Sequence, residues 1–388
     1  MTLMSKFATA FKEPPTRLWL VLRLSSFAIA SFALLYKSSE RATSSVKAFI
    51  LLPWYSYDTE YYLRIVRNGY QASDITSGFH PLYPWLAALL NVVIQNAIVS
   101  LLIVASLCGL LLVVAFYRLT LLDHDKETAW TSTALLLCWP ASVAMFAPYT
   151  ESLFLLLTVL CLIGGRTQRY LLAGLAGGFA CLTRQAGLFL VVPLAIEIWE
   201  GSDRDLWKCV SSWKNWLAIA LVPLGYAVWI AYRALEINDL RPDFSTPQHF
   251  IYSVMISPSH YKVFEDQQFL PPWSVLWLAL KAYWQGGLHF SAYGNALLGL
   301  IFLAMLVFGW RHLRTSYKAY SLTAVLIALS LKTGVPYTSL PRHLLAAVPV
   351  FIGVAATYKF RRLNFVLFIL AIMQGLMLCC FVWQTWVL

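Results

Sequence analysis

The sequence has little charge for its length, and this shortage is the most informative feature of its composition. Only 12% of the 388 residues are charged, whereas 60% are hydrophobic. Soluble domains usually contain about a quarter charged residues. A water-soluble protein of this size could not cover so much apolar surface, because its surface-to-volume ratio requires more polar residues. The composition excludes an ordinary soluble protein and predicts a polytopic integral membrane protein.

Several other signals are missing. The seven cysteines show neither paired nor metal-type spacing, which argues against a disulfide framework and against zinc. There is no Gly-rich nucleotide-binding loop. The segment 1–17 is polar, and no small-residue cleavage site follows the first apolar run, so a cleavable signal peptide is not expected. We also see no fixed-period repeat and no soluble domain.

Apolar runs are what the sequence does contain. A spanning helix needs about 20 apolar residues, and eleven runs approach that length, several of them short. They indicate an all-α protein with about eleven transmembrane helices, forming a single unit over residues 1–388. The predicted spans are 18–36, 97–119, 129–147, 150–165, 170–183, 185–199, 217–235, 289–310, 319–333, 344–358 and 363–383.

Basic residues indicate the orientation of these spans. The net charge is +11, and more than half of the 29 Lys and Arg residues lie in the shorter connecting segments, such as 166–169 and 311–318. Basic residues in short loops mark the cytoplasmic side, so their excess does not suggest a nucleic-acid partner. This pattern predicts a cytoplasmic N-terminus and an outer C-terminus.

Two longer segments, 37–96 and 236–288, would then lie on the outer face. They contain apolar stretches that are too short to span the membrane and are rich in aromatic residues. Such stretches typically form helices in the membrane interface. The predicted interfacial stretches are 46–54, 82–94 and 273–284.

The first of these outer segments contains two acidic residues among aromatic ones, Asp58 and Glu60. The residues that follow Glu60 fit a short amphipathic helix that ends at Gly69. Asp58 would lie near the start of that helix, where aspartate is a favoured capping residue. An acidic residue among aromatic residues at the membrane face is also a candidate catalytic group. From spacing alone, a cap and a catalytic carboxylate are both open.

Polar residues at other predicted outer turns are further candidates. His80 precedes Pro81, a setting that is more often structural than catalytic. Tyr149 and Glu151 lie in a turn where Glu151 also fits a helix-capping role, because acidic residues suit a helix N-terminus.

Arg184 lies inside a long apolar stretch, and we interpret its position as the outer turn of a hairpin of two short helices. Arg342-His343 follows another predicted outer turn. Arginine binds phosphate oxygens two at a time. Together, these polar residues map to one face, on turns between helices. A transporter more often places ionisable residues at mid-membrane. The pattern favours a substrate with a lipid tail and a polar head.

Four motifs, in order, resemble the PIG-V family, which contains the second mannosyltransferase of GPI-anchor assembly and bacterial relatives. The first is Tyr57-Asp58-x-x-Tyr61 followed by Phe79-His80-Pro81-Leu82-Tyr83-Pro84, although Tyr57 replaces the usual Trp and His80 the usual Phe. The others are Pro140-Ala141-Ser142 with Tyr149-Thr150-Glu151-Ser152, Leu182-Thr183-Arg184-Gln185-Ala186-Gly187 and Pro341-Arg342-His343. They extend over most of the chain.

The resemblance implies a glycosyltransferase of the C class (GT-C). Such enzymes take a sugar, here most simply mannose, from a polyprenyl-phosphate donor and carry the essential acid in the first outer loop. It assigns the acceptor hydroxyl's base to Asp58, with Glu60 as the alternative. Arg184, Arg342 and His343 would bind the donor phosphate, and His80, Tyr149 and Glu151 would bind substrate.

The resemblance also sets expectations about partners and location. The acceptor would be a membrane lipid or glycan, and transfer would invert the anomeric carbon. No cofactor is expected; a divalent metal stays an open alternative, without support from the ligand spacing. A bacterial plasma membrane is favoured over the ER, with the site on the extracytoplasmic face. The competing hypotheses are a transporter or flippase of a lipid-linked or small substrate, which predicts pseudo-symmetric halves, and a non-enzymatic scaffold.

Overall fold

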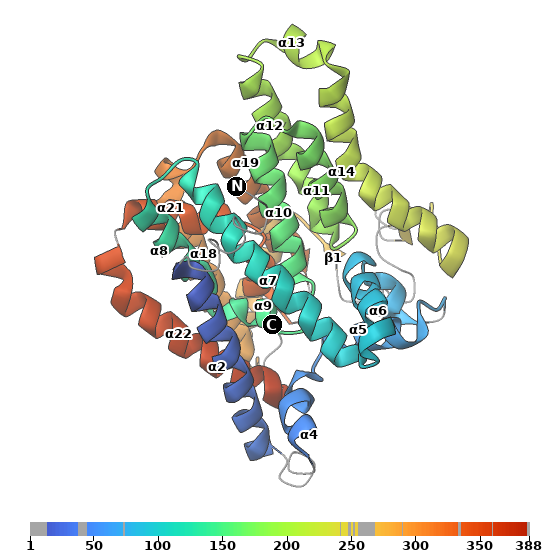
Figure 1. The fold of residues 1–388 in the computed structure, drawn as a ribbon, viewed down its shortest axis with the longest axis vertical. Helices are drawn as coiled ribbons and strands as arrows, with labels where there is room; N and C mark the ends of the chain where they lie inside the picture. The colour runs from blue at the N-terminus through green and yellow to red at the C-terminus, as the bar shows by residue number, and fades with distance from the viewer. Residues whose placement is uncertain are drawn as a thin grey trace.

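The structure, a computed structural model, describes residues 14–37, 45–72, 74–240, 242–246, 250, 253–254, 268–288, 290–332, 335–358 and 360–385. Within these ranges the chain is almost entirely helical (Figure 1). The one strand pair described is short and antiparallel, with β1 (Gln268–Phe269) beside β2 (Leu331–Lys332). The prediction of an all-α membrane protein is confirmed.

Five described helices are long and apolar enough to cross a membrane. Their apolar residues are spread around the helix, as expected where lipid or protein covers every face. These helices are α2 (Pro14–Lys37), α7 (Ala97–Leu121), α14 (Trp213–Tyr232), α18 (Phe290–Gly309) and α22 (Phe360–Trp383).

The remaining predicted spans correspond to shorter helices, so the count of eleven is not confirmed. The predicted span 129–147 is broken, because proline cannot continue a helix. Its two halves meet at Pro140 with a bend of 72°. The shorter helices are α8 (Lys126–Cys138), η3 (Pro140–Ser142), α9 (Val143–Phe146), α10 (Glu151–Arg166), α11 (Tyr170–Cys181), η4 (Gln185–Leu190), α12 (Val191–Gly201), α13 (Leu206–Ser211), η5 (Arg233–Ile237), η6 (Trp310–His312), α19 (Thr315–Ser330), α20 (Leu340–Leu344) and α21 (Pro349–Thr357).

The two longer connecting segments contain helices where the sequence predicted them. The first has α4 (Val46–Leu51), η1 (Leu52–Trp54), α5 (Asp58–Asn68), η2 (Ile75–Gly78) and α6 (Leu82–Ile94). The described part of the second has α17 (Pro272–Gln285), on which Trp273 and Trp277 are exposed. Figure 1 shows α5 and α6 together on one side of the bundle, with α13 and α4 at opposite extremes of its longest axis.

Small residues allow the central helices to approach closely. α11 packs against α14 where Gly178 meets Gly225, and a Cβ at Gly225 would collide with the carbonyl oxygen of Gly178. Close backbone contact at small residues is typical of helices that associate in membranes. This packing fixes the C-terminal end of α11, where the Arg184 turn begins.

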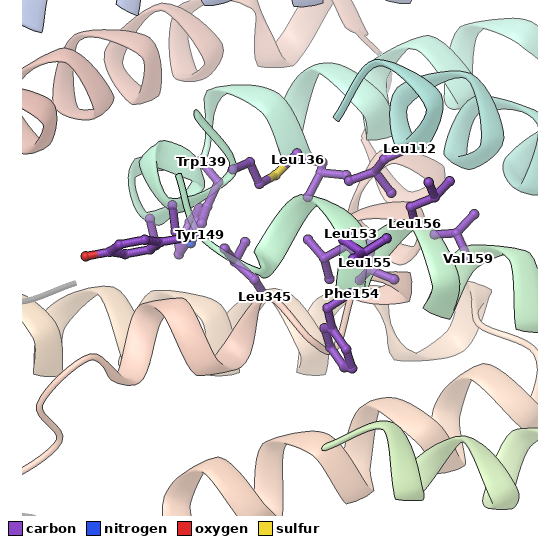
Figure 2. Close-up of a cluster of buried hydrophobic side chains, with 14 of the residues drawn as sticks. Leu112, Leu136, Trp139, Tyr149, Leu153, Phe154, Leu155, Leu156, Val159 and Leu345 are labelled. Carbon is purple, nitrogen blue, oxygen red and sulfur yellow. The ribbon is translucent and has the colours of Figure 1, made fainter. Parts of the chain in front are cut away.

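α10 is at the centre of the bundle and packs against α7 and α11. Figure 2 shows Leu156 next to Leu112 of α7, whereas Phe154 points away from them. Glu151, the first residue of α10, and Arg166, the last, are about 22 Å apart at 1.5 Å per residue.

Arg166 belongs to a polar group at the far end of α10 that we call the distal cluster. In it, Arg166 pairs with Asp123 at 2.5 Å and Arg314 pairs with Glu200 at 2.9 Å. Glu197 completes the group, 3.6 Å from Arg314. The segments that contain Asp123, Arg166 and Arg314 were all predicted to share one membrane face, and the structure brings them together.

Candidate active site

Five polar residues form a continuous chain of contacts at the N-terminal end of α10. Asp58 Oδ2 accepts a hydrogen bond from Arg342 Nη1 at 2.7 Å, and Arg342 Nε donates to Glu151. Glu151 also accepts from Arg184 Nη1, and Arg184 Nη2 lies 3.4 Å from His343 Nδ1. We call these residues the site cluster. It joins residues from all four motifs, although Asp58 and Arg342 are 284 positions apart.

Asp58 is the first residue of α5, and the backbone is strained directly before it. Tyr57 precedes the helix at φ 53° and ψ −125°, a conformation that bulky residues rarely adopt. The side chain of Asp58 binds Arg342, and the N-cap residue, Tyr57, makes no side-chain capping bond. The structure therefore favours a site carboxylate over a helix cap, the two alternatives that the spacing left open.

The side chain of Glu60 points away from the site cluster. Its carboxylate pairs with Arg64 at 2.8 Å, one turn along α5, and its side chain is 68% exposed. An exposed pair of this kind contributes little to stability. The structure thus brings Asp58 into the site cluster and leaves Glu60 on the surface of α5.

Arg342 is held from three sides. It lies on α20, after Ser339 in a left-handed conformation, and its guanidinium lies 4.4 Å from the centre of the Tyr149 ring. Burial alone would lower the pKa of Arg342, but Glu151 and Asp58 raise it well above its usual value. Arg342 is therefore a fixed cation, and Tyr149 serves as its platform.

Arg184 lies in the turn between α11 and η4, and His80 supports that turn. His80 Nδ1 donates to the carbonyl oxygen of Cys181 at 2.7 Å, and the Leu82 amide donates to that of Leu182 at 2.9 Å. Burial lowers the pKa of His80 to about 4, so the ring is neutral near pH 7. His80 thus contacts the turn that holds Arg184 and is not among the residues that line the cavity described below.

His343 is a neutral hydrogen-bond donor in this arrangement. A guanidinium can only donate, so Nδ1 of His343 must be the acceptor from Arg184, and the proton is on Nε2. Burial, followed by repulsion from Arg184 and Arg342, lowers its pKa to about 3.

An apolar cavity of about 490 Å³ opens beside the site cluster. Glu151, Arg184, Arg342 and His343 line one part of it. Its remaining walls are largely apolar and include Phe154, Phe189, Phe269, Ile327 and Leu331. Its volume is in the usual range for sites that bind small ligands. The cavity combines an apolar interior with cations and a neutral N–H donor, which suits an amphipathic anion.

Phe381 is a residue that the sequence did not single out. It is fully buried, and its ring contacts both Tyr57 and Tyr149 at 5.8 Å between centroids. Tyr57 precedes Asp58 and Tyr149 supports Arg342, so one ring of α22 braces both sides of the ion pair. In the sequence, an aromatic residue near the end of an apolar helix looks like a lipid-facing residue.

Comparison with known proteins agrees with the motifs. The family described as dolichyl-phosphate-mannose-protein mannosyltransferase matches residues 79–232. GPI mannosyltransferase 2 of Yarrowia lipolytica is 35% identical over 96 residues, which are 24% of this chain and 27% of that protein. The match thus spans about a quarter of the curated relative's length. The resemblance to this group of mannosyltransferases is confirmed.

A solved structure shows the same architecture. ArnT from Cupriavidus metallidurans, bound to undecaprenyl phosphate, superimposes with a TM-score of 0.53 at 14% identity. The superposition covers 90% of this chain and 62% of the ArnT chain. The chain has the GT-C fold.

Proposed function

We propose that this protein is an inverting glycosyltransferase that moves a sugar from a polyprenyl-phosphate donor to an acceptor hydroxyl. The site cluster carries the proposal: it gathers residues of four motifs beside an apolar cavity, within a GT-C fold. The matched relatives favour mannose as the sugar. A membrane lipid or glycan is the proposed acceptor.

The order of the contacts suggests where each part of the reaction takes place. Arg184 and His343 are at one end of the site cluster and line the cavity, so they would bind the donor phosphate. The apolar walls would hold the first units of the polyprenyl chain. Asp58 is at the other end, with its side chain 28% exposed, so an acceptor can reach it. The phosphate leaving group and the base, Asp58, are thus at separate ends of the site cluster, as direct displacement requires.

In the proposed step the acceptor oxygen forms a bond to the anomeric carbon as the bond from that carbon to the phosphate oxygen breaks. The electron pair of the broken bond stays on the phosphate, whose charge Arg184 stabilises. The acceptor's proton passes to Asp58 Oδ1, because Arg342 holds Oδ2. The anomeric carbon is inverted.

A radiolabelled donor tests this proposal directly. Purified protein would be incubated with undecaprenyl-phosphate [³H]mannose and a mixed membrane-lipid extract, and the products separated. Label should move into a new product whose identity reveals the acceptor. If label crosses the membrane of a proteoliposome while the donor stays intact, the protein is a transporter and the proposal is wrong.

We further propose that the site cluster faces the extracytoplasmic side of a bacterial plasma membrane. Ser73 and Asp266 are in the two predicted outer segments and would suit a labelling test, but they lie outside the described residues. Gln71 and Asp203 are exposed alternatives on the two proposed faces. Cysteine at Gln71, but not at Asp203, should react with an impermeant reagent in intact cells. The reverse pattern would invert the proposed orientation.

A further inference from the structure

Glu151 has one carboxylate oxygen that the site cluster does not use. Its Oε1 accepts hydrogen bonds from both Arg184 and Arg342. Its Oε2 is buried and has no hydrogen-bond partner in any other described residue. The side chain is only 3% exposed and lines the cavity. Other buried polar atoms of the described residues also lack partners, but Oε2 belongs to a charged group, and a carboxylate oxygen without a partner beside a cavity suggests a hydrogen bond that forms only when a ligand is present.

We infer that Glu151 is the residue that recognises the donor sugar, with Oε2 accepting a hydrogen bond from the hydroxyl next to the anomeric carbon. This inference rests on the proposed function and adds to it the sugar group that the site reads.

The chemistry of the donor narrows the partner to a sugar hydroxyl. A carboxylate oxygen can only accept a hydrogen bond, so its partner must be a donor. A phosphodiester has no donor at neutral pH, and a polyprenyl chain has none at all. The hydroxyls of a polyprenyl-phosphate sugar are therefore the donor groups that it can offer to Oε2.

The position of Glu151 narrows the choice of hydroxyl. Glu151 is the middle member of the site cluster, with Asp58 and Arg342 on one side and Arg184 and His343 on the other. A sugar that extends from a phosphate bound at Arg184 to an acceptor at Asp58 would pass next to the Glu151 side chain. Of the sugar's hydroxyls, the one next to the anomeric carbon is nearest to both the phosphate and the attacking oxygen.

Such a hydrogen bond would act mainly on the rate. As the bond to phosphate breaks, positive charge develops on the sugar ring and makes the adjacent hydroxyl a better donor. A hydrogen bond from this hydroxyl to a carboxylate therefore strengthens in the transition state, as in glycoside hydrolysis. Interactions that are stronger in the transition state raise kcat more than they lower KM.

The test compares two donors with two forms of the protein. Wild type and Glu151→Gln would each receive undecaprenyl-phosphate mannose and its 2-deoxy analogue, and kcat/KM would be measured for each pair. For each protein, the kcat/KM for the mannose donor is divided by the kcat/KM for the 2-deoxy analogue. Comparing this ratio between the two proteins cancels the analogue's intrinsic reactivity. The preference for the hydroxyl-bearing donor should be at least about 100-fold greater in wild type than in Glu151→Gln.

Two further variants make the result decisive. Glu151→Asp keeps the charge but withdraws the carboxylate by one methylene, so it should also weaken the preference, and it replaces Glu151→Gln if that variant does not fold. Glu197→Gln alters the buried carboxylate of the distal cluster and should leave the preference unchanged.

The outcomes separate this inference from the proposed function. Transfer with an unaltered preference in both Glu151 variants would overturn the inference and leave the proposed function standing. Loss of the wild-type preference on adding EDTA would assign Oε2 to a metal ion and overturn it too. Absence of transfer from every polyprenyl-phosphate sugar would overturn the proposed function, and the inference with it.

Discussion

The two ends of α10 carry ionic clusters of similar composition in different settings. The distal cluster has three carboxylates and two guanidiniums, and it joins the start of α19 to the ends of α10 and α12. Its buried carboxylate, Glu197, accepts a hydrogen bond from Ser316 at 2.5 Å in addition to its contact with Arg314. Its carboxylates thus have partners within the protein.

The site cluster has two carboxylates and two guanidiniums, but it borders a cavity and keeps one carboxylate oxygen without a partner. A buried charge must be paired or it destabilises the fold. Both clusters meet this requirement, since Glu151 pairs with Arg184 and Arg342 just as the carboxylates of the distal cluster pair with Arg166 and Arg314. Each cluster also keeps a buried polar atom without a hydrogen bond, Arg314 Nε in the distal cluster and Glu151 Oε2 in the site cluster. The comparison therefore points to the cavity beside Glu151, more than to charge or to an unpartnered atom alone, as the feature that marks the end of α10 proposed to bind a ligand.

Asp58→Asn, in the site cluster, should have the largest effect on catalysis of the variants at the two ends of α10. Removal of a general base slows catalysis by about 100-fold or more. We expect kcat to fall by this factor while the protein still folds and binds donor, measured by product formation and by donor binding in detergent. Glu60→Gln is the control and should stay active, because Glu60 pairs with Arg64 on the surface. Near-normal turnover by Asp58→Asn would remove Asp58 from the mechanism.

Arg184→Lys should weaken donor use by at least about tenfold. Lysine keeps the charge but loses the planar fork that contacts Glu151 and His343 together. The matched variant is Arg166→Lys at the other end of α10, which should leave the KM for donor unchanged. Equal KM values for the two variants would give Arg184 a structural role only.

Glu197→Gln should have the opposite effect from the site variants: it should lower stability and leave catalysis unchanged. It removes a buried carboxylate that Ser316 and Arg314 contact, and the partners left unsatisfied should lower the free energy of unfolding by about 1–3 kcal/mol. Denaturation in detergent would measure this loss. A large change in kcat with normal stability would show that the distal cluster takes part in the reaction.

The last prediction concerns the pH dependence of stability. The pKa of His343 is about 3 in the folded protein, against an ordinary value of 6.5, so between these pH values the unfolded chain binds a proton that the folded chain does not. Stability from this source is complete above pH 6.5 and falls as the pH drops, by at most about 1.4 kcal/mol per pH unit. His343→Gln should lose less stability than wild type between pH 6.5 and 4. Identical profiles would contradict the buried, neutral state of His343.

Sequence reasoning found the residues of the site cluster but not their pairing. Arg184, Arg342 and Asp58 lie in motifs that stand out in an apolar chain. Their partners could not be foreseen, because Glu151 and Arg342 are 191 positions apart and meet only through helix packing. Glu151 is the clearest case: its position at a helix start suggested a cap, whereas its carboxylate is the centre of the cluster.

The fold was predictable in kind and less so in detail. Apolar runs and basic loops were sufficient to predict a helical membrane protein, and the amphipathic pattern of α5 predicted its end at Gly69. The bend at Pro140 was missed because the apolar run continues through it. Helices of 9 to 16 residues, such as α21 and α10, are also hard to count as spans from composition alone.

The length of α10 has a consequence for where the sugar is handled. Its 16 residues extend for about 24 Å, less than the roughly 30 Å of a bilayer's hydrocarbon core. If the distal cluster marks one boundary of the hydrocarbon core, the site cluster would lie several ångströms inside the other. The donor phosphate would then bind at a depth normally occupied by the first isoprene units of the lipid. The rest of the lipid tail could remain in the bilayer throughout a catalytic cycle. In that case α10 would set the depth of the proposed reaction, because its N-terminal end would lie about one helical turn inside the hydrocarbon core.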